Sequence, residues 1–135
     1  TVFPFGNQVA TTVVTGENLW KALENGVSGW PADGRFPQVS GLKFTFDTSK
    51  PVGSRIVTVT KLDGTAIAKD STVYTLTTLD YIIYGGDGYV NVFSPTKAKV
   101  FGALLDDFVA AIKADMAAGK VTQIPVADGR VKKVN

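Results

Sequence analysis

The segment DYIIYGGDGY, residues 80–89, decides how the chain is organised. At its centre, four residues that favour tight turns follow one another: Gly85, Gly86, Asp87 and Gly88. Tyrosines flank the turn on both sides, at Tyr81, Tyr84 and Tyr89. Rings that can face a flat ligand, beside a carboxylate that accepts hydrogen bonds from hydroxyl groups, are typical of a pocket wall. A turn between two buried segments, with its rings in the core, fits the same residues.

The length and composition indicate a single domain, residues 1–135, that is large enough to bury a core. Hydrophobic residues make up 44% and charged residues 19%, as in ordinary globular proteins. The net charge is only +2 and the basic residues are scattered, so we predict no nucleic-acid partner. No apolar run approaches the roughly 20 residues of a membrane-spanning helix, so we predict no membrane partner.

The chain contains neither histidine nor cysteine. This excludes a Ser-His-Asp triad, a histidine base, a cysteine nucleophile and a zinc site with histidine or thiolate ligands. The acidic side chains Asp106, Asp107 and Asp115 fall on the polar side of a predicted helix, where carboxylates usually interact only with water. We therefore predict no catalytic residue and no metal ligand in this chain.

The pattern of hydrophobic residues predicts strands over residues 8–14, 42–46, 55–61 and 73–79. Shorter extended segments are predicted over 65–68, after the Asp63-Gly64 turn, over 89–93 and near the end, through Val134. Leu42, Phe44 and Phe46 alternate with polar residues, which indicates a half-buried strand.

Two helices are predicted. The first covers residues 16–25, with Thr15 as N-cap, Gly26 as C-cap, and Leu19 and Leu23 on its buried face. The second is amphipathic and ends at Gly119; its apolar residues recur at helical spacing: Phe101, Leu105, Phe108, Ile112 and Met116. Because helices and hairpins mix without a βαβ rhythm, the predicted class is α+β with a mixed, mostly antiparallel sheet.

Three sequence blocks, taken in order, carry a resemblance that extends over essentially the whole chain. They are FPFGN at residues 3–7, GRFPQVSG at 34–41, and DY at 80–81 leading into GGDGY at 85–89. Together they resemble the C-terminal domain of the 5′-nucleotidase family, whose relatives include UDP-sugar hydrolases and 2′,3′-cyclic-nucleotide phosphodiesterases. Arg35 in the second block could contact a ligand or hold its loop to backbone carbonyls.

The resemblance implies that the chain binds a nucleoside or nucleotide similar to adenosine or AMP. It places the base between the rings of Phe5 and Tyr81, Asn7 at the base edge, and Asp87 on the ribose hydroxyls. Family members commonly have phenylalanine where this chain has Tyr81, and either ring can stack. Gly85, Gly86 and Gly88 are expected to let the ligand approach closely.

The resemblance also implies what lies outside this chain. A separate domain with two divalent metal ions performs the hydrolysis, and an earlier arginine segment of the C-terminal domain helps to hold the nucleotide. The apolar start Val2-Phe3-Pro4-Phe5 is typical of a trimmed product, so a truncated domain without its N-terminal part is expected. The expected location is secreted, periplasmic or at the cell surface.

Two functions remain open from the sequence. The chain is either a nucleoside-recognition domain or a structural and interaction fragment that no longer binds nucleotide. The fragment would associate with itself or with the rest of its parent through exposed apolar surface.

Overall fold

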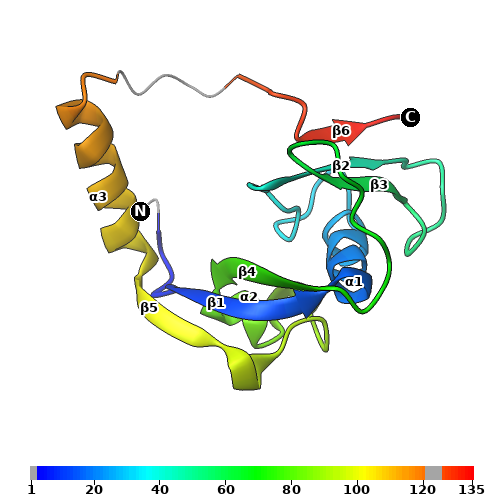
Figure 1. The fold of residues 1–135 in the computed structure, drawn as a ribbon, viewed down its shortest axis with the longest axis horizontal. Coiled ribbons are helices and arrows are strands. Elements are labelled where there is room, and N and C mark those ends of the chain that lie inside the picture. Colours follow the sequence, from blue (N-terminus) through cyan, green and yellow to red (C-terminus); the bar gives the residue numbers. More distant parts are fainter. Residues whose placement is uncertain (1–2, 121–125) are drawn as a thin grey trace.

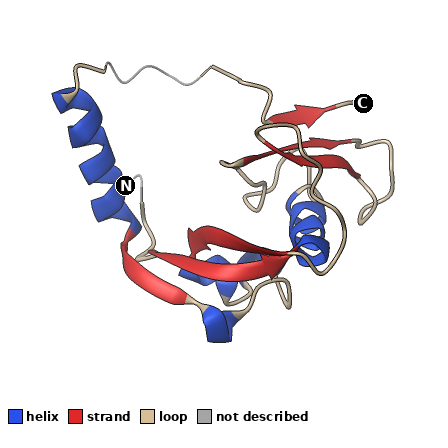
Figure 2. Cartoon of the chain, viewed as in Figure 1, coloured by secondary structure: helices blue, strands red, loops and turns tan. Residues whose placement is uncertain are grey.

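The computed structural model describes residues 3–120 and 126–135, so Thr1 and Val2 of the predicted apolar start lie outside it. Its main elements form two three-stranded sheets and two helices of more than ten residues (Figure 1). Helices and strands are mixed along the chain (Figure 2), which confirms the α+β class. The elements, in chain order, are β1 (Gln8–Thr15), α1 (Gly16–Gly26), β2 (Leu42–Phe46), β3 (Ile56–Lys61), β4 (Val73–Leu79), α2 (Asp80–Ile83), η1 (Gly86–Gly88), η2 (Pro95–Lys97), β5 (Lys99–Ala103), α3 (Leu104–Ala117) and β6 (Val131–Lys133).

The first sheet has the order β4-β1-β5, with β1 in the middle and both neighbours antiparallel to it. Val9 lies opposite Leu79 at one end of the β1–β4 pair, and Thr15 lies opposite Val73 at the other. This register brings the residues just before β1 next to the residues just after β4. Segments far apart in the sequence therefore meet at one edge of the sheet.

The second sheet has the order β3-β2-β6, and its central strand supplies much of the core. The side chains of Phe44 and Phe46 are each only 1% exposed, and Leu42 is buried beside them. The alternation predicted for β2 is therefore confirmed. β6 runs parallel to β2, whereas β3 runs antiparallel to it.

Helix α1 packs against the second sheet and begins as predicted. The Thr15 hydroxyl accepts a hydrogen bond from the Asn18 N–H, which satisfies a free donor of the first turn. Leu19 and Leu23 are buried in the same cluster as Phe44. The predicted C-cap role of Gly26 is wrong, because Val27 ends the helix and Gly26 does not have positive φ. Instead, a Cβ on Gly26 would lie 2.6 Å from Cδ of Pro37, so glycine permits close packing there.

Two predicted extended segments have other conformations. Residues 65–68 form one isolated bridge, Thr60 to Ala66, rather than a strand. Residues 89–93 form turns, with Asn91 at φ 59°, and Tyr89 and Val92 both pack on Ala22 of α1. Residues three apart share one side in a turn but point to opposite sides in a strand, so packing on α1 selects the turn.

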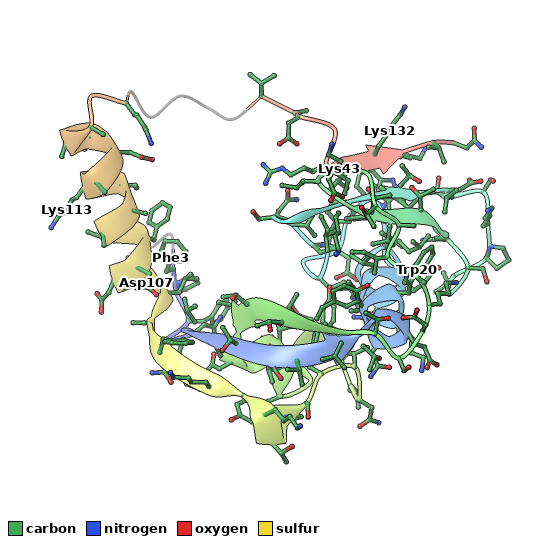
Figure 3. All side chains as sticks on the ribbon, viewed as in Figure 1. Phe3, Trp20, Lys43, Asp107, Lys113 and Lys132 are labelled. Atoms are coloured by element: carbon green, nitrogen blue, oxygen red, sulfur yellow. The ribbon has the colours of Figure 1, made fainter. Side chains whose placement is uncertain are left out.

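Helix α3 begins later than predicted, because Phe101 belongs to β5. Gly119, at φ +71°, ends it as predicted, and its N–H donates to the Met116 carbonyl. The apolar face of α3 is exposed: Met116 is 65% and Leu105 49% accessible. Phe3 lies beside α3, its ring centroid 5.0 Å from that of Phe108, while Asp107 and Lys113 also project from the helix (Figure 3).

None of the helices in the described ranges combines the length and the apolar character that crossing a bilayer requires.

Candidate functional site

A cleft of about 590 Å³ lies between the two sheets, with helix α1 contributing to its floor. Its apolar lining includes Leu19 and Leu23 from α1, Leu42 from β2 and Leu76 from β4. A volume of this size, apolar below and polar at its edges, is typical of sites for small organic molecules.

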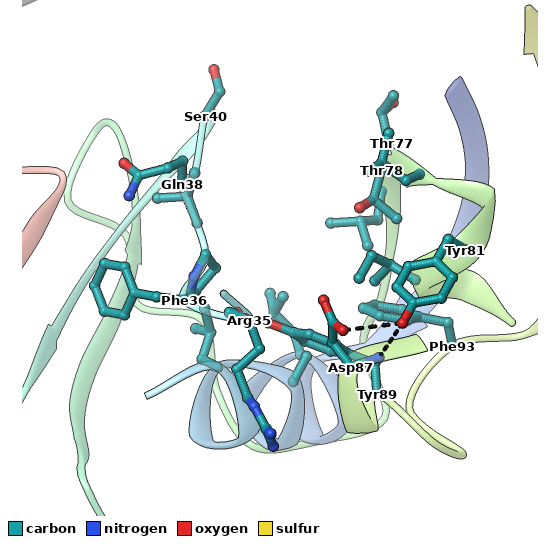
Figure 4. A pocket seen from close by; sticks show the side chains of 18 of the residues that line it. Arg35, Phe36, Gln38, Ser40, Thr77, Thr78, Tyr81, Asp87, Tyr89 and Phe93 are labelled. Atoms are coloured by element: carbon teal, nitrogen blue, oxygen red, sulfur yellow. Dashed lines mark hydrogen bonds between the residues drawn. The ribbon is translucent and has the colours of Figure 1, made fainter. Parts of the chain in front are cut away.

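The walls of the cleft carry neutral polar side chains. Gln38 and Ser40 stand on one side, and Thr77 and Thr78 on the other (Figure 4). The first pair lies in the loop before β2 and the second near the end of β4, so one wall adjoins each sheet. Hydroxyl and amide groups can both donate and accept hydrogen bonds, which suits an uncharged polar ligand.

Four of the predicted site residues line this one cleft: Phe5, Asn7, Tyr81 and Asp87. The pairing of β1 with β4 explains the meeting, since Asn7 directly precedes β1 and Tyr81 follows β4. Phe5 is 75% exposed and Tyr81 47% exposed, so neither ring is a core residue. The alternative that the rings around the turn belong to the core is therefore wrong for Tyr81, although it holds for Tyr89, which is buried.

The turn after α2 fixes the direction of the Asp87 carboxylate. Tyr81 donates its hydroxyl to Oδ1 of Asp87 over 3.1 Å, and the Asp87 N–H donates back to that hydroxyl over 3.3 Å (Figure 4). Asp87 has left-handed backbone geometry, φ 51°, which aspartate tolerates better than most residues. Its carbonyl accepts a hydrogen bond from the Asn25 side chain of α1. The ring and the acid are thus one connected unit.

The three glycines shape this turn and are not among the residues that line the cleft. Gly85 has φ 98°, which a side chain would disfavour. A Cβ on Gly86 would overlap the Tyr81 ring, and one on Gly88 would lie 3.0 Å from Oδ1 of Asn25. In this structure the groups that approach the glycines closely belong to the protein itself. Close approach of a ligand stays a prediction, whereas the placing of Tyr81 and Asp87 is a role that the geometry shows.

Arg35 is held within its own loop by the Asp33 carboxylate, and not by the backbone carbonyls of its second predicted role. Its Nε lies 2.9 Å from Oδ2 of Asp33, an ion pair in which the N–H does not point along a hydrogen bond. The Arg35 backbone N–H and guanidinium hold the pKa of Asp33 below its ordinary value. Figure 4 shows the guanidinium directed away from the space between the two walls.

Tyr89 links the two sides of the cleft from below. Its hydroxyl donates to the Arg35 carbonyl over 2.8 Å, and its ring stacks on Phe93. Burial, assisted by the negative charge of Asp87, raises the pKa of Tyr89 to about 12. The phenol therefore remains protonated at physiological pH and keeps this hydrogen bond.

Reasoning from the sequence missed the polar walls at Gln38, Ser40, Thr77 and Thr78. For Gln38 and Ser40, the available signal was the family resemblance of the block at residues 34–41. The polar threonines near the end of a strand were the other available signal.

Over residues 3–120 and 126–135, no group of three or more acidic side chains gathers where it could hold a metal ion. Since histidine and cysteine are absent from the whole sequence, the donor set does not fit a two-metal centre. No chemical step through a metal can be assigned to these residues.

The fold and the site define a class: an α+β domain whose cleft has exposed aromatic rings and one carboxylate at its edge. Comparison with known families identifies it further. The family model described as 5′-nucleotidase, C-terminal domain, matches residues 1–95. The chain belongs to this family, as its sequence blocks suggested.

Individual relatives agree with this membership. The chain is 33% identical to "Trifunctional nucleotide phosphoesterase protein YfkN" of Bacillus subtilis, in an alignment that covers 98% of this chain. It is 34% identical to a cell wall protein of Listeria monocytogenes, in an alignment that covers 89% of this chain. A 5′-nucleotidase precursor from Thermus thermophilus has a similar structure, with a TM-score of 0.82, 32% identity and 99% of this chain covered. The chain spans only 9%, 15% and 26% of these three proteins, respectively.

Proposed function

We propose that this chain is a nucleoside-recognition domain of a 5′-nucleotidase-type phosphohydrolase. One observation carries the proposal: Phe5, Asn7, Tyr81 and Asp87, from two segments far apart in the sequence, line the same cleft. Two of the three relatives are named for action on nucleotides, which supports a ligand of this chemical class.

In the proposed complex, the base lies between the rings of Phe5 and Tyr81, where stacking contributes about 1–3 kcal/mol per base and tolerates different bases. The Asn7 amide contacts the base edge. The Asp87 carboxylate accepts hydrogen bonds from the ribose hydroxyls, and such charge-assisted bonds are stronger than neutral ones. Oδ1 of Asp87 is already held by Tyr81, so the carboxylate is oriented before the ligand arrives.

The charges at the cleft favour the nucleoside portion over the phosphate. Asp87 repels an anion, and the guanidinium of Arg35 is paired with Asp33. We propose that the phosphate of an AMP-like ligand projects out of the cleft. Its hydrolysis belongs to a separate domain with two divalent metal ions, and this chain alone is inactive. Because one relative is a cell wall protein, we also propose a secreted, periplasmic or cell-surface location.

The role of Asp87 can be tested by removing its carboxylate from the protein and, separately, the ribose hydroxyls from the ligand. We expect Asp87→Ala to weaken adenosine binding about tenfold or more, because hydrogen bonds to charged groups contribute about 1.5–3 kcal/mol each. The wild type should bind 2′,3′-dideoxyadenosine more weakly than adenosine by a similar factor. The variant should bind both ligands equally, because it lacks the acceptor. Isothermal titration calorimetry measures all four affinities.

Asp63→Ala is the matched control, since Asp63 is also a turn carboxylate that accepts a hydrogen bond, from the Thr65 N–H, but it does not line the cleft. If Asp87→Ala still prefers adenosine over the dideoxy ligand by the wild-type factor, the assignment of Asp87 is wrong. If the wild type binds no nucleoside up to millimolar concentration, the proposed function fails.

A second candidate is an interaction fragment that associates with a second copy, and the exposed face of α3 favours it. Leu105, Phe108 and Met116 remain accessible on that helix. In an antiparallel pair of α3 helices, the acidic first turn at Asp106 and Asp107 would face the last turn of the other copy, which has no basic residue. The exposed apolar face alone therefore favours this candidate, since such surface often marks a protein–protein contact.

We expect the double substitution Leu105→Ser and Met116→Ser to abolish this dimer, because it removes apolar side chains from the shared face. Multi-angle light scattering over a wide concentration range should find a dimer for the wild type and a monomer for the variant. The control is Val52→Ser and Val73→Ser, which changes equally exposed residues elsewhere. A wild type that is monomeric at every concentration would exclude this candidate.

A further inference from the structure

We propose that Asp80 is a positioning residue that holds the two halves of the nucleoside site together. This inference rests on the proposed function above. A single carboxylate oxygen, Oδ1 of Asp80, accepts the N–H of Gln8 over 3.0 Å and the N–H of Tyr81 over 2.8 Å. The two donors are far apart in the sequence. Gln8 directly follows the predicted ligand contact Asn7, and Tyr81 is itself a predicted ligand contact.

The first donor controls the segment that contains Phe5 and Asn7. Gln8 directly follows Asn7 and is the first residue of β1. On its other side, the Asn7 carbonyl accepts the N–H of Leu104 over 3.1 Å. The peptide group that joins Asn7 to Gln8 is therefore fixed at both of its polar atoms, at one by Asp80 and at the other by the start of α3.

The second donor controls the ring that faces this segment. Tyr81 directly follows Asp80, and its hydroxyl holds the Asp87 carboxylate. The connection thus runs from Gln8 through Asp80 to Tyr81 and on to Asp87. One carboxylate joins the backbone of both segments that carry the predicted stacking partners.

Packing alone does not supply this order. Phe5 is 75% exposed, and a Cβ on its neighbour Gly6 would meet no atom within 4 Å. A segment with so few contacts needs hydrogen bonds to keep one position, and a site held in its binding geometry loses less entropy when the ligand arrives. Asp80 itself does not line the cleft, so its effect would pass through the residues that it holds.

A simple role as a helix cap does not account for the arrangement. Capping α2 would need only an N–H of that helix, whereas Gln8 belongs to another element. The bond to Gln8 is the part that matters for binding.

The test measures the adenosine affinity and the hydrogen exchange of individual amides in a set of variants. Asp80→Ala should weaken adenosine binding about tenfold, as expected when a contact residue loses its support. It should also speed exchange at Gln8 and Tyr81. Asp80→Asn should restore affinity to within about threefold, because an amide oxygen can accept both bonds. Asp63→Ala, which removes a similar turn carboxylate that does not line the cleft, should leave affinity unchanged.

Further variants separate positioning from general stability. Gln8→Pro removes the Gln8 N–H at a strand start where proline is tolerated, and Gln8→Ala, which keeps this N–H, is its control. Only the proline variant should weaken binding as much as Asp80→Ala. It also provides the test if Asp80→Ala does not fold. In the Asp80→Ala background, Phe5→Ala should cost less affinity than in the wild type, because Phe5 is already misplaced.

Unchanged adenosine affinity in Asp80→Ala or in Gln8→Pro overturns the proposal. The proposal is also overturned if the losses of adenosine affinity in Asp80→Ala and Phe5→Ala are fully additive in the double variant. If the wild type binds no adenosine, the proposed function fails, and the exchange data decide on Asp80 by themselves. Faster exchange at both amides in Asp80→Ala supports the link, and unchanged exchange overturns it.

Discussion

Replacing Phe44 by alanine should lower the free energy of unfolding by about 3–5 kcal/mol, the usual cost of removing a fully buried phenylalanine. Phe44 is 1% exposed and lies in the cluster that joins β2, β3 and α1. Its ring centroid is 6.1 Å from that of Phe46, so the cavity would open at the centre of the core. A domain of this kind has a total stability of about 5–15 kcal/mol, and the loss is a large share of it.

Chemical denaturation followed by tryptophan fluorescence measures this loss. The midpoint should fall while the slope stays the same, since the surface exposed on unfolding barely changes. Thermal unfolding should shift downward on the order of 10–20 °C. Phe5→Ala is the control with the same chemistry at an exposed position, and it should change stability by no more than about 0.5 kcal/mol. Equal losses in both variants would mean that the core is not centred on β2.

The same Phe5→Ala variant, which should keep nearly all of its stability, should bind adenosine much more weakly. We expect its affinity for adenosine to fall by about 5- to 150-fold, which corresponds to the 1–3 kcal/mol that stacking on one ring contributes. The fold should remain intact, because Phe5 is largely exposed and contributes little to the core. Phe5→Trp, which keeps a stacking surface, should bind at least as well as the wild type.

Calorimetric titration with adenosine measures the difference. Phe101→Ala is the matched control: Phe101 is also exposed but does not line the cleft. If Phe5→Ala and Phe101→Ala bind adenosine equally well, Phe5 does not stack on the base and the cleft needs another interpretation.

Much of the secondary structure could be predicted, and for a local reason. The alternation of Leu42, Phe44 and Phe46 with polar residues describes a strand with one buried face, and β2 has that form. Thr15 could be identified as an N-cap because its role depends on a residue only three positions away. Patterns of this range do not depend on how the chain packs.

The errors arose where packing between distant segments determined the conformation. Gly26 had the position of a helix C-cap, but the approach of Pro37 explains why it is glycine. Residues 89–93 have the composition of a strand, yet Tyr89 and Val92 pack on α1 and adopt turns. Local propensity cannot anticipate either contact, because each partner lies outside the segment whose pattern was used.

For the candidate site, the chemical types of Phe5, Asn7, Tyr81 and Asp87 were evident from the sequence, and their suggested roles came from the family resemblance. Their convergence on one cleft was not evident from composition or spacing. It depends on the antiparallel register in which Val9 faces Leu79, and a shift of one residue would turn every side chain of the strand to the other face.

The amino-acid sequence was sufficient to predict the α+β class, most of the strands and helices, the absence of histidine and cysteine chemistry, and the family. These properties follow from residue identity and from short-range periodicity. The three-dimensional structure was needed to show that two distant segments share Oδ1 of Asp80 and that Tyr81 holds Asp87. It also showed that the glycines between Tyr81 and Tyr89 make room for the protein's own groups. Those features depend on strand register and on contacts between segments, which no local pattern encodes.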